Sequence, residues 1–352
     1  MRRYQRLLVI GLGLGLLAFI AVTLLSDVQN LLRYALLFPW LIMLPVLALR
    51  VVNWAIRFGK WHFYLRLVGV RGISVRDSAA TFVSGLAMAA SPGKAAELLK
   101  CFIVRNLTGT PLATTVPVIA AERLTDGIAV LLLMIWSIVE LARPEYVPIA
   151  LGSLAVIALA VVIISIRPLC LALLTVAARL PVIGRYTTAF RTFYDSSYQI
   201  VQPKNLLFAI GSGVIGNTLD GVGVFLILAA LGRPFSSETF FQALLAISFS
   251  VVTGSVSGSP GGIGASDLTI TGVLQKVAGL SLAEAGFATL LARFVQLWWG
   301  VLVGLLVAFL FRHRLFPPSL EATIAEAQPS VIASSLPNSA PTVGAPTEGA
   351  LS

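Results

Sequence analysis

The sequence predicts an all-α fold: a polytopic membrane helix bundle whose internal repeat forms two inverted, re-entrant helical hairpins. Hydrophobic residues make up 57% of the chain and charged residues 11%, and the mean hydropathy is +0.92. Soluble proteins carry about 25% charged residues, so this composition indicates an integral membrane protein. A proline-glycine motif that occurs twice, and basic residues that cluster between apolar stretches, predict the repeat and its orientation.

The first apolar stretch, Leu7 to Leu25, has nineteen residues without a charge and follows Arg2, Arg3 and Arg6. A secretory signal is one interpretation, but a small-residue cleavage site is missing and further apolar stretches follow. We therefore expect a retained first helix that crosses the membrane.

The net charge of +10 comes from basic residues in short segments beside apolar stretches. This is the positive-inside pattern, which places both termini on the cytoplasmic side of a plasma membrane. Attraction to anionic lipid headgroups is a second use for the same residues, and no nucleic acid partner is expected. The basic segments are 2–6, 57–76, 167–204 and 312–314.

A second helix, from about Tyr34 to Phe58, is expected to return to the cytoplasm. Arg50, Asn53 and Arg57 lie toward its inner end. We expect these side chains to snorkel toward the headgroups, although Arg50 is deep enough in the span to be a functional candidate.

The next apolar stretch, from about Asp77 to Leu107, has basic residues at both ends and Ser91-Pro92-Gly93 at its middle. Proline removes an amide donor and glycine permits a sharp bend. The pattern predicts a re-entrant hairpin that opens to the cytoplasm. Such backbone is tolerated at membrane depth only where protein or a watery cavity covers it.

An outward helix over about 114–139 and an inward helix over 147–166 are expected next. The linker over about 167–204 mixes basic and aromatic residues, which favours an interfacial amphipathic helix. An outward helix over about 205–231 then carries Asn217 and Asp220 near its middle.

The apolar stretch from about Phe240 to Leu280 has Pro260-Gly261-Gly262 at its centre. The last helix, over about 283–311, must start outside if it ends at the cytoplasmic basic cluster. The second hairpin would then open to the outside, opposite to the first. Inverted repeats with broken helices that meet near the midplane are typical of transporters.

The two hairpins share a register, which indicates duplication. Glu97 and Asp267 each precede a glycine by twelve residues and an arginine, Arg123 or Arg293, by twenty-six. We place repeat 1 at about 77–139 and repeat 2 at about 239–311. Both belong to one transmembrane domain over 1–316, and a tail over 317–352, poor in large apolar residues, is expected to be disordered in the cytoplasm.

Several charged residues fall inside apolar helices, where a charge costs at least about 2.5–3.5 kcal/mol on insertion scales. Neighbours three residues apart on a helix can pair, and such pairs could serve only to hold helices together. The expected pairs are Arg123 with Asp126, Arg293 with Gln296 and Asn217 with Asp220.

The equal spacing of an acid and an arginine in both repeats favours a functional interpretation. Arg123 and Arg293 could bind a phosphate, while Glu97 and Asp267 balance the charge or bind an ammonium group. The candidate substrate-binding residues are Glu97, Arg123, Asp126, Asn217, Asp220, Asp267 and Arg293.

Other chemistries have little support. Gly93-Lys94 is similar to the end of a phosphate loop, but Met88 occupies the position of the first glycine and Ala95 follows the lysine. The two histidines, His62 and His313, belong to no cluster with metal-ligand spacing. We expect no cofactor, no metal and no catalytic residues.

The motifs together resemble the transmembrane region of lysylphosphatidylglycerol synthases, a flippase-like domain found both fused to soluble enzymes and alone. The resemblance covers about residues 5–312 and departs from the family at Ala96, where glycine is usual, and at Asp267, where glutamate is common. No soluble synthase domain is expected. The matching stretches are Pro92-Gly93 with Glu97, Glu122 to Asp126, and Pro260 to Gly264 with Asp267 and Arg293.

The resemblance implies movement of a lipid with a charged or sugar headgroup between leaflets, with Glu97, Arg123, Asp126, Asp267 and Arg293 on its path. We therefore expect membrane lipids as partners, and the sequence is compatible with a homo-oligomer. Two alternatives stay open: a membrane-embedded transferase that acts on a lipid-linked donor, and a non-transporting partner of another membrane protein.

Overall fold

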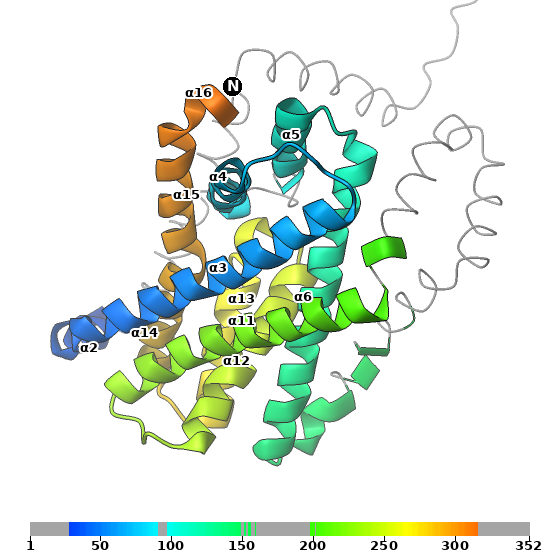
Figure 1. The fold of residues 1–352 in the computed structure, drawn as a ribbon. Helices are drawn as coiled ribbons and strands as arrows, with labels where there is room; N and C mark the ends of the chain where they lie inside the picture. Colours follow the sequence, from blue (N-terminus) through cyan, green and yellow to red (C-terminus); the bar gives the residue numbers. More distant parts are fainter. Residues whose placement is uncertain are drawn as a thin grey trace, which may run out of the picture.

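Helices are the only regular elements in the part of the chain that the computed structural model describes (Figure 1). That part comprises residues 28–90, 97–148, 198–200 and 202–315, with 151–152, 154–155 and 159. The expected first helix, the turn at Pro92-Gly93, the C-terminal tail, and most of the expected helix over 147–166 and of the linker over 167–204 lie outside these residues.

The chain begins with α2 (Val28–Leu37), a 3-10 turn η1 (Trp40–Ile42) and α3 (Met43–Leu67). The first hairpin segment and the helix after it comprise α4 (Val75–Leu86), η2 (Ala87–Ala90), α5 (Glu97–Thr108) and α6 (Leu112–Glu140), followed by η4 (Pro144–Tyr146). The second half contains α11 (Pro203–Ala230), α12 (Ser237–Val256), η5 (Pro260–Gly262), α13 (Ala265–Ala278), α14 (Leu282–Arg293), the π-helical turn η6 (Phe294–Trp298), α15 (Trp299–Leu310) and α16 (Arg312–Leu315).

Four helical segments of the described chain are long and apolar enough to cross a membrane: Trp40–Leu67, Pro203–Ala230, Ser237–Val256 and Leu282–Leu310. The 29-residue α6 is longer than α12, but it carries Glu122, Arg123 and Asp126 within one helical stretch. These three charges, rather than its length, distinguish α6 from the four apolar segments. The composition and these four segments both indicate a membrane protein.

The predicted break at Pro260 to Gly262 in the second apolar stretch is confirmed, whereas the predicted turn of the first stretch lies outside the described residues. The first stretch forms α4 and α5, of twelve residues each, or about 18 Å at 1.5 Å per residue, which is shorter than a bilayer core of about 30 Å. The second forms α12 and α13, which pack against each other along their length. With twenty residues, α12 is long enough for a full crossing, so the two stretches differ in depth.

The second turn shows why glycine follows proline there. Gly261 and Gly262 have φ angles of 59° and 70°, a left-handed region that other residues rarely adopt. A Cβ on Gly262 would also lie 3.2 Å from the Cα of Gly254 and closer still to the hydroxyl of Ser266. The turn backbone therefore lies directly against the end of α12 and the Ser266 side chain of α13.

Helix α3 packs along α11 in antiparallel orientation, and the two cross the middle of the molecule side by side (Figure 1). Arg50 contacts Asp220 and Asn53 contacts Gly216, so numbers rise along one helix as they fall along the other. Helix α6 also runs opposite to α14 and α15 (Figure 1).

The two halves exchange contacts in a reciprocal way. Helix α6 packs on α12 of the second half, and α15 packs on α4 of the first half. The turns η2 and η5 also contact each other. Broken helices from both halves therefore meet inside the bundle, next to the α3 and α11 pair.

Candidate functional site

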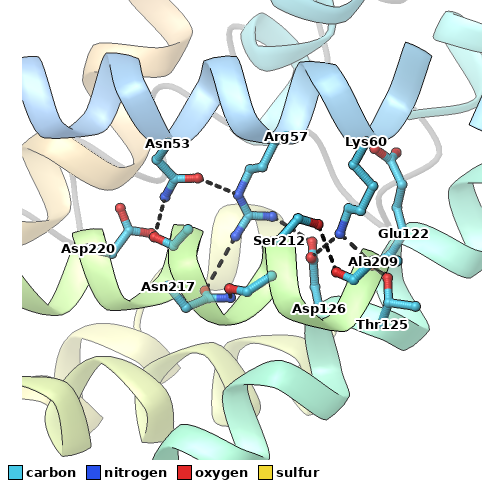
Figure 2. Close-up of polar contacts among 12 residues, drawn as sticks. Asn53, Arg57, Lys60, Glu122, Thr125, Asp126, Ala209, Ser212, Asn217 and Asp220 are labelled. Atoms are coloured by element: carbon cyan, nitrogen blue, oxygen red, sulfur yellow. Dashed lines mark hydrogen bonds and ion pairs between the residues drawn. The ribbon is translucent and has the colours of Figure 1, made fainter. Parts of the chain in front are cut away.

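A row of polar side chains on one face of α3 starts the candidate site. Arg50, Asn53, Arg57 and Lys60 follow each other at intervals of three, four and three residues, which places them on one helical face. Figure 2 shows Asn53, Arg57 and Lys60 directed toward α11 and α6. We call the polar contacts between α3, α6 and α11 the polar seam.

Asp126 of α6 is the centre of the polar seam. Its carboxylate accepts a hydrogen bond from the Arg57 guanidinium, with an Nη1 to Oδ2 distance of 2.5 Å, and forms a second ion pair with Lys60. The Lys60 ammonium also lies 3.4 Å from the Thr125 hydroxyl. The Lys60 side chain is 1% exposed and that of Arg57 is 22% exposed, so one carboxylate pairs with a buried and a partly buried cation.

Amide side chains extend the polar seam toward α11. Asn53 accepts a hydrogen bond from Arg57 Nε at 2.7 Å and donates one to the Gly216 carbonyl at 2.9 Å. Asn217 accepts a bond of 3.3 Å from Arg57 Nη2. Because Arg57 thus contacts three different side chains, its guanidinium is fixed in position (Figure 2).

Arg50 lies one turn before Asn53 on α3 and connects this helix to two other elements. Its Nη1 lies 2.8 Å from each carboxylate oxygen of Asp220 on α11. Its Nη2 donates to the carbonyl of Gln296 in the π-helical turn η6, at 2.9 Å. The pair is only partly accessible, with 14% of the Arg50 side chain and 9% of the Asp220 side chain exposed.

Lys100 of α5 continues the charged row at Glu122, one turn before Asp126 on α6. Its ammonium lies 3.3 Å from a carboxylate oxygen of Glu122. It also lies over the ring of Trp61 at 4.5 Å and near the ring of Phe82 at 5.4 Å. The aromatic faces and the carboxylate together stabilise a buried cation.

A separate pair lies beside the second turn. Arg293 Nε is 2.7 Å from a carboxylate oxygen of Asp267, and Arg293 Nη2 donates to the Gly261 carbonyl at 2.7 Å. The other oxygen of Asp267 accepts from the amide of Gly264 at 2.8 Å. Asp267 and Arg293, the equally spaced acid and arginine of repeat 2, are therefore direct partners.

The predicted side-chain pairs within single helices were wrong in two cases. Asp220 pairs with Arg50 rather than with Asn217, and Arg293 pairs with Asp267 rather than with Gln296. In the third case the Asp126 partners in the polar seam are on α3, whereas Arg123 is exposed. Asp220, Arg293 and Asp126 thus form ion pairs with side chains of neighbouring helices.

Snorkelling of the α3 residues was also a wrong prediction. Arg50, Asn53 and Arg57 turn inward to carboxylates and amides of other helices. The helical spacing of Arg50, Asn53, Arg57 and Lys60 could have identified this face from the sequence. Lys60, Lys100 and Glu122 were missed as members of the site.

The predicted substrate-binding residues that the structure describes fall into two separate groups. Glu97 begins α5, and its side chain lies outside the described residues, as do Pro92 and Gly93. Asp126, Asn217 and Asp220 meet around the α3 cations, whereas Asp267 and Arg293 form their own pair. Groups of histidine, cysteine, aspartate and glutamate that could hold a metal do not occur among the residues described.

The comparison with family models identifies one match. The model of the lysylphosphatidylglycerol synthase TM region matches residues 6–304, a span that contains the polar seam and both broken stretches. No curated protein matches the chain significantly.

Proposed function

The chain belongs to the lysylphosphatidylglycerol synthase transmembrane family, and we propose that it binds an amphiphilic lipid with a charged or glycosylated headgroup and moves it between leaflets. The headgroup passes along the polar seam while the acyl chains stay in the bilayer. The protein acts without covalent chemistry on the lipid, in the plasma membrane, with both termini in the cytoplasm.

The excess of cations in the polar seam is the observation that carries this proposal. A buried charge in a membrane span is costly and is a functional candidate by default. With the Lys100 and Glu122 pair included, the described side chains of this row hold four cations and three carboxylates, so they can accept one anionic group such as a phosphate. The cations are Arg50, Arg57, Lys60 and Lys100, and the carboxylates are Glu122, Asp126 and Asp220.

We also propose that the two repeats are inverted in the membrane. The antiparallel pairing of α3 with α11 and the opposite directions of α6 and α15 support this arrangement. So does the reciprocal packing of each repeat's last helix on the other repeat's first helix. Such repeats provide alternating access by rocking around a central site, and movement would be downhill or coupled to an ion gradient.

Cysteine labelling tests the inverted arrangement. With Cys101 and Cys170 replaced, single cysteines at Thr110 and at the exposed Ser281 should react from the cytoplasm and from the outside respectively. Both positions lie just before the last helix of their repeat. Labelling of both from the same side would refute inversion.

A translocation assay tests the function itself. Purified protein is reconstituted into vesicles that contain a phospholipid with a fluorescent acyl chain, and dithionite quenches the label in the outer leaflet. We expect the wild type to expose nearly all of the label, and Arg57→Gln to slow this by at least tenfold. Arg57 is the choice because its guanidinium joins α3 to α6 and α11.

Arg143→Gln is the matched control, since it removes the same charge from an exposed pair with Glu145 at 3.8 Å. It should translocate at the wild-type rate. If wild-type vesicles quench no further than empty vesicles, the translocation proposal fails. Wild-type activity in Arg57→Gln would instead exclude the polar seam as the path.

A further inference from the structure

An ion pair attaches the end of repeat 2 to the start of repeat 1. Arg314 of α16 has its Nε 2.7 Å from Asp77 Oδ1, and its Nη2 donates to Asp77 Oδ2 at 2.8 Å. One guanidinium therefore contacts both carboxylate oxygens, as in the strong pairs of arginine with carboxylates. Asp77 lies in the first turn of α4, so the pair connects the two repeats directly.

Apolar contacts surround this ion pair. Leu315, the residue after Arg314, is fully buried and belongs to the same cluster as Ala80 of α4. The Arg76 guanidinium lies 5.2 Å from the centroid of the Phe311 ring. Helix α15 packs on α4, and α16 contacts α4 as well (Figure 1). The end of the last helix thus packs against the first hairpin, at the side that we expect to be cytoplasmic.

The surroundings of Asp77 differ from those of a permanent buried ion pair. Its Oδ2 also accepts from the Ser74 hydroxyl at 2.7 Å, and its charge lies where the dipole of α4 favours an acid. The Arg314 side chain is 59% exposed, so water can solvate its charge after separation. The pair can therefore open without leaving either charge buried and unpartnered, and so exposed a pair contributes little to stability.

Helix α4 connects this ion pair to the polar seam. The Ser78 hydroxyl of α4 lies 3.0 Å from Nδ1 of His62, two residues beyond Lys60 on α3. The ring of Phe82, also on α4, is 5.4 Å from the Lys100 ammonium. A movement of α4 therefore changes the surroundings of the cations at this end of the charged row.

The equivalent contact between α6, the last helix of repeat 1, and α12, the first helix of repeat 2, is apolar. The Trp136 and Phe241 rings meet edge to face at 5.2 Å. The acids there accept hydrogen bonds within their own helices, Glu140 from the Trp136 indole and Glu238 from the Gln242 amide. Apolar packing thus joins the repeats in both places, and in one of them an ion pair strengthens it.

We propose that the Asp77 and Arg314 pair, together with Leu315, is a latch that closes the cytoplasmic side of the lipid path and opens in each transport cycle. This inference rests on the proposed function and on the inverted arrangement of the repeats. Alternating access requires contacts between repeats that separate on one side while they hold on the other. An ion pair whose members are both stabilised when apart meets that requirement.

A cross-link tests the latch. With Cys101 and Cys170 replaced, Asp77→Cys and Arg314→Cys are joined by a short bis-maleimide, and lipid movement is followed by dithionite quenching in vesicles. We expect the cross-link to slow translocation at least tenfold relative to the unreacted variant. The same reagent on Arg314→Cys alone is the control, because it modifies the site without joining the helices. A merely structural contact would be preserved by the cross-link, so an unchanged rate would overturn the latch.

A labelling experiment tests the latch independently of lipid movement. Ala80→Cys, in the same background, places a thiol in the buried cluster that contains Leu315. We expect Arg314→Gln to make an impermeant maleimide label it about fivefold faster from the cytoplasmic side, the effect of losing one exposed ion pair. Arg312→Gln is the matched control, since its exposed guanidinium lies over the Phe309 ring. Equal labelling rates in the two variants would overturn the latch.

The two experiments distinguish failure of the latch from failure of the proposed function. Equal translocation with and without the cross-link would leave lipid movement in place and remove the latch. If the unreacted protein and the wild type both move no lipid, the proposed function fails, and the labelling rates still decide whether the repeats separate at this ion pair.

Discussion

Asp267 of repeat 2 and Asp126 of repeat 1 form ion pairs of different kinds. In repeat 2, Asp267 and Arg293 bond directly at 2.7 Å and lock the second turn through the Gly261 carbonyl and the Gly264 amide. In repeat 1, the buried acid of α6 is Asp126, and it forms ion pairs with Arg57 and Lys60 of α3, outside the repeat.

This difference shows that neighbouring helices decide the partner of a buried charge. Helix α3 presents Arg57 and Lys60 to Asp126, whereas α11, its counterpart before repeat 2, has Asn217 and Asp220 facing α3. In the second half, the Asp267 and Arg293 pair therefore stabilises the turn next to it. The first half connects separate helices through charge, which suits a region that rearranges around a headgroup.

The largest expected loss of stability distinguishes Asp126 from Asp267. Asp126→Asn leaves the buried Lys60 and the partly buried Arg57 without a carboxylate and should lower the free energy of unfolding by about 3–5 kcal/mol. Asp267→Asn leaves one cation that still bonds the Gly261 carbonyl, so we expect about 1.5–3 kcal/mol. Thermal unfolding of both variants in one detergent gives the comparison.

A second substitution checks the cause of the Asp126 effect. Lys60→Met in the Asp126→Asn background removes one of the two unpaired cations and should recover part of the lost stability. Lys60→Met alone should not stabilise the protein. Equal unfolding temperatures for Asp126→Asn and Asp267→Asn would mean that the two acids are equivalent after all.

Packing between the halves gives the next largest effect. Helix α15 approaches α4 so closely that a Cβ on Gly304 would lie 2.9 Å from the Val83 carbonyl and closer still to the Ala87 amide. Gly304→Ala must push the backbones apart, at a cost of about 1–3 kcal/mol. Gly272→Ala is the control, because the space around that helical glycine is open.

The same unfolding experiment measures both glycine variants. Gly272→Ala should be neutral or stabilising, since alanine favours the helix. A Gly304→Ala protein as stable as the wild type would show that the α15 and α4 contact tolerates separation. The reciprocal packing of the two repeats would then be looser on this side than its close approach indicates.

The helices were largely predictable from the sequence, because apolar length and basic flanks decide where a chain can cross a membrane. The predicted helix over 114–139 became α6 (Leu112–Glu140), and that over 205–231 became α11 (Pro203–Ala230). The break at Pro260 to Gly262 followed from proline and glycine chemistry. The π-helical turn in the last helix carries no comparable signal, since it depends on contacts with α3.

The site was predictable only in part. Asp126, Asn217 and Asp220 were found because a charged or amide group in an apolar helix is conspicuous. Their partners were missed because pairing was sought within each helix, whereas the geometry joins positions 66 to 170 residues apart. The period of Arg50, Arg57 and Lys60 contained the missing information, but it required treating basic residues as buried.

The smallest effect concerns how the last helix of each repeat begins. Ser281 caps α14: its hydroxyl accepts from the Glu284 amide at 3.2 Å, and the Glu284 carboxylate accepts from the Ser281 amide at 3.0 Å. Helix α6 begins after Pro111 without a side-chain cap. Ser281→Ala should therefore cost about 1 kcal/mol, while Ser237→Ala, at an exposed first-turn position of α12, should change stability by less than about 0.5 kcal/mol. Equal unfolding temperatures for these two variants would mean that packing against α13, rather than the Ser281 cap, determines where α14 starts. The last helix of repeat 2 would then begin, like α6, without a stabilising contribution from a side-chain cap.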